Sequence, residues 1–269
     1  MLGNGRGMTR LQDVTSHHWR VPAEPFGVTT EDGVHLEGTR LGDPSASRSA
    51  LVLAHGLMGW HRKPRFAVFA EHMTQGFTVY AMDMRGHGHS GGICDYGGDE
   101  IFDIEAVHRL ARADGHATVV TCGTSMGGIA TIRHGALIGG ADAVVAVSPL
   151  ASWDWQGDAH PSARPSLQAR IGTPAGRATM RAVGVRMPDR WTPPESPIEV
   201  VGKIAPTPLL IVHGADDRLF PPSHARRLYE AAAEPKRLLI GRRFGHAEDG
   251  LTPAFAHKLL GTLAEMVPS

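Results

Sequence analysis

The sequence predicts an α/β protein whose sheet is mostly parallel and doubly wound. Short apolar runs alternate along the chain with segments in which apolar residues recur every three or four positions. Within the apolar runs there is no alternation with polar residues, which is typical of strands buried on both faces of a parallel sheet. With 269 residues, of which 42% are hydrophobic, the chain is long enough for one large core of this class.

The first element is expected to be an antiparallel hairpin over residues 26–42. Two short runs rich in β-branched residues meet at Asp32 and Gly33, whose residue types tolerate the positive φ of a tight turn. Parallel strands are expected at six apolar runs, which are residues 50–54, 78–82, 118–122, 143–147, 209–212 and 237–240. Helices are expected where the spacing is helical, over residues 66–73, 101–111, 129–136, 225–232 and 255–263. Right-handed crossovers between such strands give a doubly wound sheet.

We expect three parts, which are a polar tail over residues 1–20, a core formed by residues 21–149 and 207–269, and a cap inserted at residues 150–206. The insertion has no clear strand, is rich in proline, tryptophan and arginine, and is too long for an ordinary connection. We expect short helices over the carboxyl edge of the sheet, where ligands bind in open α/β folds. The alternative is a surface excursion far from any site.

The insertion contains four arginines, which are Arg164, Arg170, Arg177 and Arg181. These cap arginines are expected to form a solvated helix face or, alternatively, to attract a carboxylate on the substrate.

The composition favours a small molecule as the partner. Lys and Arg together number 27, as do Asp and Glu, so the net charge provides no attraction to nucleic acid or to an anionic membrane. The two cysteines, Cys94 and Cys122, are too few for a disulfide framework or a four-cysteine zinc site. No apolar run approaches a membrane span, and the first residues lack the apolar stretch of a signal peptide. We therefore expect a cytoplasmic protein without stable membrane association, either monomeric or homo-oligomeric.

The pattern G-x-S-x-G occurs twice, around Ser125 and around Ser90. A nucleophile elbow requires a strand before the serine, a helix after it and small flanking residues, because strand and helix approach closely there. Ser125 has this context, whereas loop residues surround Ser90, which we expect to be a turn residue. Ser125 is therefore the candidate nucleophile, with a helix N-cap as the alternative interpretation.

An elbow of this kind also predicts an oxyanion site. Free backbone N–H groups at the start of a helix face an anion that forms beside the serine oxygen. The N–H of Met126 is therefore one candidate donor. The second is expected from the loop after the first parallel strand, where the backbone of Leu57 lies in the segment HGLMG.

A serine hydroxyl needs an imidazole as its base, and the imidazole needs a carboxylate that fixes its tautomer. Among 16 histidines, His246 follows the last strand and should lie at the carboxyl edge of the sheet. Asp216 and Asp217 follow the preceding strand, and either could orient the base. Asp83 lies at the same edge, but its place before a glycine-rich loop indicates that it holds that loop. His55 is expected to form part of the oxyanion turn, whereas His87 and His89 are expected to be structural or solvated. No metal is expected at the His87–His89 pair, because no third ligand is suggested.

Five motifs follow one another along residues 50–250, namely HGLMG, DMRGHGHS, GTSMGG, HGADDRLFPP and FGHAED. With them the chain resembles the α/β-hydrolase superfamily, particularly its small serine esterases, monoacylglycerol lipases and S33-type aminopeptidases. The resemblance implies the α/β-hydrolase fold, with Asp217 as the acid, His246 as the base, and Leu57 and Met126 as the oxyanion donors. It does not name the substrate, because members of the superfamily hydrolyse esters, amides, thioesters and carbon–carbon bonds.

We expect a serine hydrolase, a carboxylesterase or lipase-like enzyme, that cleaves a small to medium acyl ester through an acyl-enzyme and needs no metal or organic cofactor. Apolar residues near the site are expected to bind the acyl group, namely Met58, Trp60, Leu150, Trp153 and Trp155. The alternative is that the tryptophans only pack the cap onto the core. Two other functions stay open, which are a cofactor-free perhydrolase or acyltransferase using the same residues and a non-catalytic small-molecule receptor.

Overall fold

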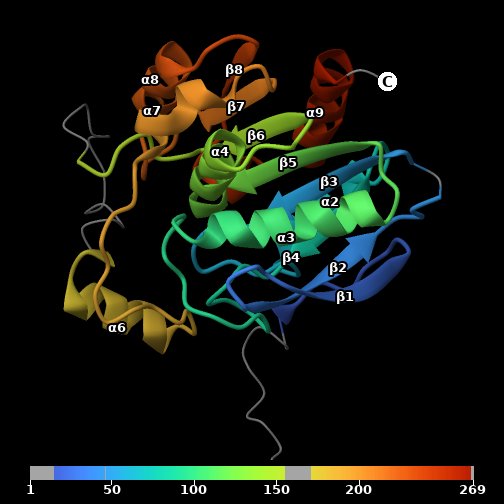
Figure 1. The fold of residues 1–269 in the computed structure, drawn as a ribbon. Coiled ribbons are helices and arrows are strands. Elements are labelled where there is room, and N and C mark those ends of the chain that lie inside the picture. The colour runs from blue at the N-terminus through green and yellow to red at the C-terminus, as the bar shows by residue number, and fades with distance from the viewer. Residues whose placement is uncertain (1–14, 46, 155–170, 268–269) are drawn as a thin grey trace, which may run out of the picture.

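A computed structural model describes residues 15–45, 47–154 and 171–267, which are built around an eight-stranded sheet (Figure 1). The strands are β1 (Ala23–Thr29), β2 (His35–Leu41), β3 (Ser49–Ala54), β4 (Thr78–Met82), β5 (Thr118–Thr124), β6 (Ala143–Val147), β7 (Leu209–Gly214) and β8 (Lys236–Gly241). Their order in the sheet is β1-β2-β4-β3-β5-β6-β7-β8. β2 is antiparallel to both β1 and β4, and all other neighbouring strands are parallel.

The strands lie where the sequence predicts them. β1 and β2 form the expected hairpin, and Gly33 in its turn has a φ of 84°, which a residue without Cβ adopts without strain. The backbone N–H of Val34 donates to the Thr30 hydroxyl at 2.9 Å and closes the turn. The other six strands begin and end within two residues of the six apolar runs.

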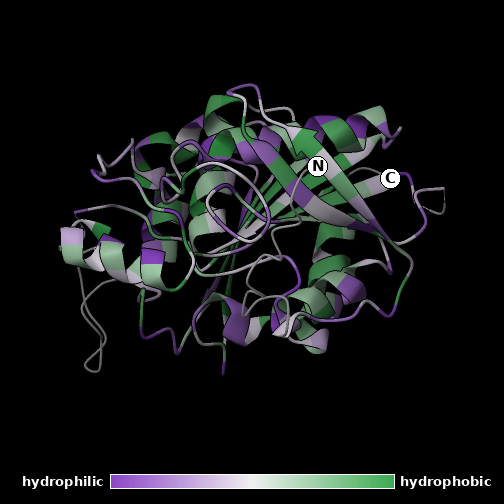
Figure 2. Cartoon of the chain, turned by 90° about the horizontal axis from the view of Figure 1, so that it is seen from below, coloured by the Kyte–Doolittle hydropathy of each residue, from purple (hydrophilic) through white to green (hydrophobic). Residues whose placement is uncertain are grey.

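Successive residues of each buried strand face opposite sides of the sheet. On β3, Val52 belongs to the core on one side, whereas Leu51 and Leu53 belong to the core on the other. The first side is covered by α3 (Glu100–Ala113), α4 (Met126–Leu137) and α8 (Ser223–Ala231), and the second by α2 (Pro64–Met73) and α9 (Pro253–Met266). Figure 2 shows hydrophobic residues concentrated along the central strands. Two covered faces confirm the predicted doubly wound fold.

The described part of the predicted cap divides between two places. α6 (Pro174–Ala182) lies to one side of the sheet and its helices (Figure 1), and Met180 packs into the same apolar cluster as Tyr96. In contrast, α7 (Pro197–Val200) and the following turn of 3-10 helix η1 (Val201–Ile204) pack against α4 and α8. Residues 155–170 lie outside the described residues, so the division into core and cap stays a prediction.

Residues 15–20, predicted as the end of the polar tail, contact the core. The His17 Nε2 atom lies 3.0 Å from Glu71 Oε1 on α2. Trp60 Nε1 donates to the Ser16 hydroxyl at 3.0 Å. Within the described ranges, none of the helices combines the length and apolar character that crossing a membrane requires.

Leu53→Ala is expected to lower the free energy of unfolding by roughly 2–5 kcal/mol, because the fully buried side chain would leave a cavity. The control is Leu137→Ala at the end of α4, where the side chain is 38% exposed. It should cost less than about 1 kcal/mol. Urea unfolding followed by circular dichroism measures both, and equal losses would contradict the burial of Leu53.

Candidate active site

Ser125 lies at a sharp bend between β5 and α4. Its φ of 51° and ψ of −115° are unusual for a residue with a Cβ, and its backbone N–H donates to Val147 O at 2.8 Å. Ser125 stands at the N-cap position of α4, as the alternative interpretation expected, but its side chain makes no capping hydrogen bond. Instead, Ser125 Oγ lies 2.9 Å from His246 Nε2.

The glycines around Ser125 allow three backbone segments to meet. A Cβ on Gly123 would lie 2.1 Å from Gly127 O, and a Cβ on Gly127 would lie 2.5 Å from Ala54 O. A Cβ on Gly56 would lie 3.1 Å from the Cβ of Ser125. No side chain fits at the first two positions, which explains why the elbow needs glycine on both sides of the serine.

The second half of the site joins the loops that follow β7 and β8. His246 Nδ1 donates to Asp217 Oδ2 at 2.8 Å, because a carboxylate can only accept. Asp217 Oδ1 accepts the backbone N–H groups of Leu219 and Phe220, both at 2.9 Å. Of the two candidate acids, the structure therefore brings Asp217 to the imidazole, whereas Asp216 is exposed.

Asp217 is held as a carboxylate. Burial by itself raises the pKa of Asp217, but hydrogen bonds from His213 and His246 outweigh burial and hold this pKa well below its usual range. His213 Nε2 lies 3.3 Å from Asp217 Oδ2 and 2.8 Å from Phe220 O. A negative charge beside His246 fixes the tautomer in which Nε2 accepts a proton.

Three residues that the sequence analysis did not select support His246. His213 contacts the acid, and the ring of Phe220 lies edge-on to the imidazole with centroids 5.1 Å apart. The Ser148 hydroxyl accepts the backbone N–H of Ala247 at 3.0 Å. Ser148 directly follows β6. The expectation that residues just after the parallel strands gather at the carboxyl edge of the sheet would therefore also have found it.

The two predicted oxyanion donors flank the serine. Met126 is the first residue of α4, and the loop of Leu57 is brought to Ser125 by the close approach of Gly56. His55 Nδ1 donates to Gly56 O at 2.8 Å and Gly59 N donates to the same oxygen at 3.0 Å, which fixes the loop. Among the described residues, no acceptor binds the N–H of Leu57 or Met126. Both groups therefore stay candidate oxyanion donors.

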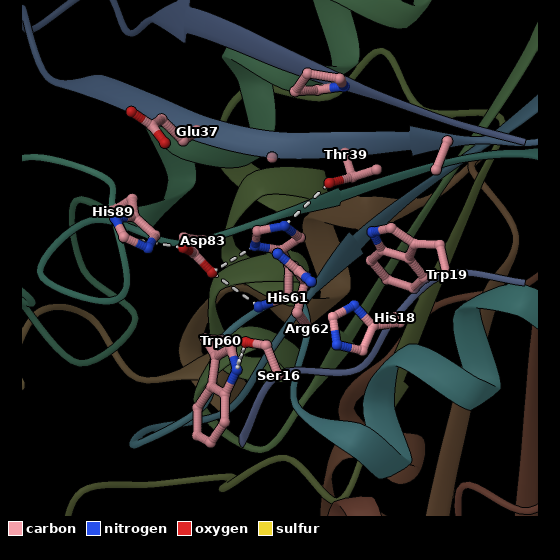
Figure 3. A pocket seen from close by; sticks show the side chains of 13 residues that line it. Ser16, His18, Trp19, Glu37, Thr39, Trp60, His61, Arg62, Asp83 and His89 are labelled. Atoms are coloured by element: carbon pink, nitrogen blue, oxygen red, sulfur yellow. Dashed lines mark hydrogen bonds and ion pairs between the residues drawn. The ribbon is translucent and has the colours of Figure 1, made fainter. Parts of the chain in front are cut away.

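Ser90 and Asp83 hold the loop after β4, as predicted. The Ser90 hydroxyl donates to Asp83 O and accepts the Glu37 N–H at 2.9 Å. Asp83 accepts His61 N at 2.8 Å, His61 Nδ1 at 2.7 Å and His89 N at 2.9 Å (Figure 3). Neither residue is left with a free reactive group, so the second G-x-S-x-G match is structural.

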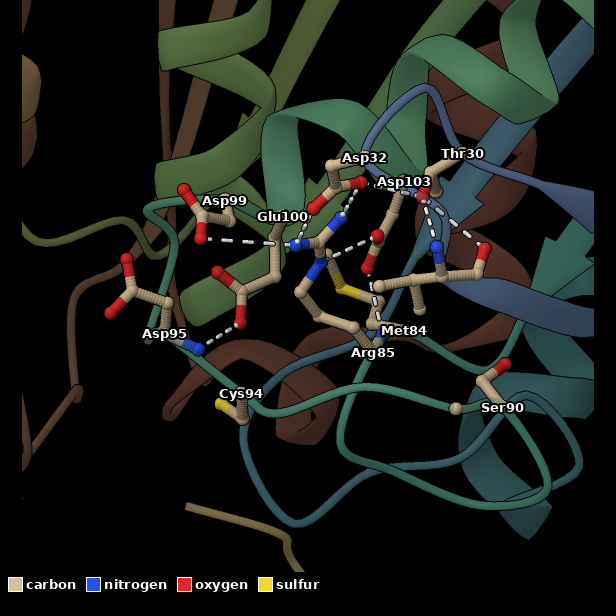
Figure 4. A network of polar contacts seen from close by, with 12 residues as sticks. Thr30, Asp32, Met84, Arg85, Ser90, Cys94, Asp95, Asp99, Glu100 and Asp103 are labelled. Atoms are coloured by element: carbon tan, nitrogen blue, oxygen red, sulfur yellow. Dashed lines mark hydrogen bonds and ion pairs between the residues drawn. The ribbon is translucent and has the colours of Figure 1, made fainter. Parts of the chain in front are cut away.

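Arg85 anchors the same loop to the hairpin and to α3. Its Nε donates to Asp103 Oδ1 at 2.8 Å, and its two terminal nitrogens reach Asp32 at 2.7 and 2.9 Å (Figure 4). His87 is buried and its Nδ1 lies 3.0 Å from Arg85 O. Burial lowers the pKa of His87 to about 3, so this imidazole is neutral.

The ranges that the structure describes hold no group of three or more side chains suited to a metal ion.

The residues predicted to bind substrate fall into different environments. Leu150 and Trp153 belong to the apolar cluster that includes Met126, and the Trp153 ring lies 5.4 Å from Trp191. Met58 is 43% exposed. Trp60 lines a different cavity of about 480 Å³, together with Ser16 and Asp83 (Figure 3), and Ser125 is not part of its wall. Trp155 lies outside the described residues.

Two cap arginines hold the cap backbone. Arg177 is 6% exposed and donates to Ile171 O and Asp189 O, both at 2.8 Å, so the predicted solvated face is wrong for it. Arg181 donates to Asp189 Oδ1 at 2.6 Å and to Met187 O. Their guanidinium groups are engaged within the cap. Arg164 and Arg170 lie outside the described residues.

The sheet order and covered faces are those of an α/β hydrolase. Similar solved structures include an esterase from Pyrococcus furiosus, Pf2001, with a TM-score of 0.73 and 19% identity over 97% of this chain and 99% of that one. Another is the α/β hydrolase GrgF from Penicillium sp. sh18, with a TM-score of 0.72 and 18% identity over 92% of this chain and 99% of that one. At these identities the likeness shows the fold.

The chain belongs to the S33 serine aminopeptidase family, whose model matches residues 45–196, and it is a hydrolase by family. Two similar proteins are uncharacterized. YfhR of Escherichia coli K12 is 26% identical over 229 residues, which are 81% of this chain and 71% of that protein. YqkD of Bacillus subtilis 168 is 30% identical over 177 residues, which are 64% of this chain and 56% of that protein.

Gly127→Ala is expected to lower the free energy of unfolding by roughly 1–3 kcal/mol, because the new methyl group would clash with backbone atoms of β3. Gly261→Ala is the matched control, since a Cβ there has no neighbour within 4 Å and the residue lies inside α9. This control should gain about 0.5–1 kcal/mol. Thermal or urea unfolding compares the two variants, and a stable Gly127→Ala protein would argue against the tight packing at the elbow.

Proposed function

We propose that this protein is a serine hydrolase that cleaves esters of small or medium acyl groups. The observation that carries the proposal is the hydrogen-bonded chain from Ser125 Oγ to His246 Nε2 at 2.9 Å and from His246 Nδ1 to Asp217 at 2.8 Å. A hydroxyl, an imidazole and a carboxylate in this order form the unit that activates serine nucleophiles.

The reaction begins with proton transfer from Ser125 Oγ to His246 Nε2 as the oxygen attacks the ester carbonyl carbon. Negative charge then develops on the carbonyl oxygen, and the backbone N–H groups of Leu57 and Met126 stabilise it. His246 returns the proton to the leaving alcohol as the carbon–oxygen bond breaks, which leaves an acyl group on Ser125. Water then attacks this acyl-enzyme while His246 Nε2 takes its proton. The bond between the acyl carbon and Ser125 Oγ breaks, His246 returns the proton to Oγ, and the free acid leaves.

Asp217 supports both steps through its charge. Its low pKa keeps it ionised at neutral pH, so it stabilises the imidazolium that forms on His246. Each proton transfer passes through His246 Nε2, while Nδ1 keeps its proton throughout. None of these steps requires a metal or an organic cofactor.

The acyl group is proposed to contact apolar residues on the helix α4 side of the sheet. Leu150, Trp153 and the ring of Phe220 belong to the cluster that contains Met126, the first residue after the nucleophile. Met58 lies on the oxyanion loop with its side chain partly exposed. Trp60 is left out of this proposal, because it packs against Ser16.

Ser125→Ala should reduce hydrolysis of p-nitrophenyl butyrate by roughly 10⁴–10⁶-fold, because the variant has no nucleophile. Ser90→Ala is the control, since it removes the serine of the other G-x-S-x-G match. Its rate per folded molecule should stay within about threefold of the wild-type rate. Initial rates are compared after circular dichroism has shown that both variants fold. Activity in Ser125→Ala together with its loss in Ser90→Ala would reverse the assignment.

Asp217→Asn should lower kcat by about 10⁴-fold, because an amide neither fixes the required tautomer nor stabilises the imidazolium. Asp216→Asn, one residue away and exposed, should leave kcat within about twofold. The same chromogenic ester measures both variants. A larger loss of kcat in Asp216→Asn would move the acid role to that residue.

The alternative function is tested with the wild-type protein and the same ester. Faster acyl transfer to peroxide or an alcohol than to water would assign the perhydrolase or acyltransferase activity.

A further inference from the structure

A cavity separate from Ser125 lies beside the end of the edge strand β8. Its volume is about 480 Å³, which is within the range of small-molecule sites. The apolar part of its wall comes from β7, β8, the loop after β8 and the first turn of α9, and includes Val212, Leu239, Ile240, Phe244 and Phe255.

The charged residues in this wall all have the same sign. Arg242 and Arg243 follow β8, and Lys258 lies on α9. No carboxylate lines the cavity, and in the described chain none of these three cations has an ion-pair partner. Neighbouring cations behave differently, because Lys63 pairs with Glu248 and Arg65 pairs with Asp249 at 2.8 and 2.9 Å. Within the described residues, the positive charge of this wall is therefore not neutralised by a carboxylate.

Arg243 has a φ of 55°, a left-handed conformation that a residue with a Cβ rarely adopts. Such backbone conformations gather at functional sites, where surrounding contacts hold them in place. Here the next residue, Phe244, is buried, and a Cβ on Gly241 or Gly250 would lie only 2.9 or 2.0 Å from its ring. The packing of Phe244 thus holds the segment that carries the two arginines.

In the cavity of Figure 3 the buried polar groups bind one another. There, Asp83 accepts hydrogen bonds from His61 and His89, and Thr39 Oγ1 lies 3.1 Å from His61 Nε2. Those contacts account for its buried polar groups without a ligand. Beside β8, in contrast, the three cations are exposed and face an apolar wall.

We propose that the cavity beside β8 binds an amphiphilic monoanion, a molecule with an apolar chain and one terminal anionic group such as a carboxylate. The chain would contact the apolar wall, and the anionic group would contact Arg242, Arg243 and Lys258. A bound amphiphile suits the geometry better than a membrane surface does, because the apolar residues line a hollow. The large hydrophobic side chains that project from the described surface lie elsewhere, at Met58, Ile93, Leu137, Ile138 and Val183.

Backbone hydrogen bonds join the wall of this cavity to the loop that carries the candidate acid. Phe244 and Gly241 in the cavity wall accept hydrogen bonds from Asp216 N and Ala215 N at 3.1 and 2.9 Å. His246 follows two residues after Phe244. The ligand would therefore lie against the segment that joins the acid loop to the base.

The test is calorimetric binding of decanoate below its micelle concentration, with decanol and decyltrimethylammonium as neutral and cationic probes of equal chain length. Decanoate should bind at least about tenfold more tightly than decanol, and the cationic probe should not bind. The Arg242→Gln/Arg243→Gln double variant and Lys258→Gln should each weaken decanoate binding, the double variant by about tenfold or more. Arg226→Gln, an exposed arginine on α8, is the control and should bind as the wild type does.

Absence of decanoate binding would overturn the proposal, as would equal binding of decanol or an unchanged affinity in the double variant. Binding to phosphatidylglycerol vesicles without binding to free decanoate would also overturn it and would assign a membrane-surface patch instead. Because the readout is binding, an inactive Ser125→Ala protein gives the same test. Failure here is therefore distinct from failure of the proposed hydrolase activity.

Discussion

The candidate site depends on the close approach of three backbone segments around Ser125. β5, the loop after β3 and the first turn of α4 meet at distances that leave no room for a Cβ on Gly123 or Gly127. This contact forces the bend that turns the hydroxyl away from capping α4, and it also brings the Leu57 loop next to the nucleophile. The same packing thus places the candidate nucleophile beside the loop of Leu57 and the first residue of α4, which carry the two proposed oxyanion donors.

The chain contains a second hydroxyl–imidazole–carboxylate series, and its surroundings explain why the two differ. Thr39, His61 and Asp83 repeat the connectivity, with separations of 3.1 and 2.7 Å. Burial by itself raises the pKa of Asp83, but the hydrogen bonds from His61 outweigh the effect of burial and hold this pKa well below its usual range. Thr39, however, lies on β2 and pairs with Ala81, whereas Ser125 is followed directly by the first residue of α4. Reactivity requires oxyanion donors as well as the relay.

The periodicity of apolar residues and the order of the motifs predicted the strands and helices, because a buried parallel strand is a local run of apolar residues in the sequence. The same reasoning located Ser125 and His246, whose roles follow from their positions after strands. It left Asp216 and Asp217 unresolved, because the choice depends on how the loop turns to donate two N–H groups to Asp217. The role of Trp60 stays a prediction, and its hydrogen bond to Ser16 is a contact between distant segments that no local pattern encodes.

The acid and the base are aligned by backbone contacts more than by their own side chains. A Cβ on Gly214 would lie 2.0 Å from Phe244 O, so the loops after β7 and β8 run in direct contact before either reaches its functional residue. Ser148, at the end of β6, then holds Ala247 immediately after the base. Three neighbouring parallel strands thus fix one imidazole from two sides. Such a scaffold holds His246 in position, as the proposed role of a base that accepts and returns a proton would require.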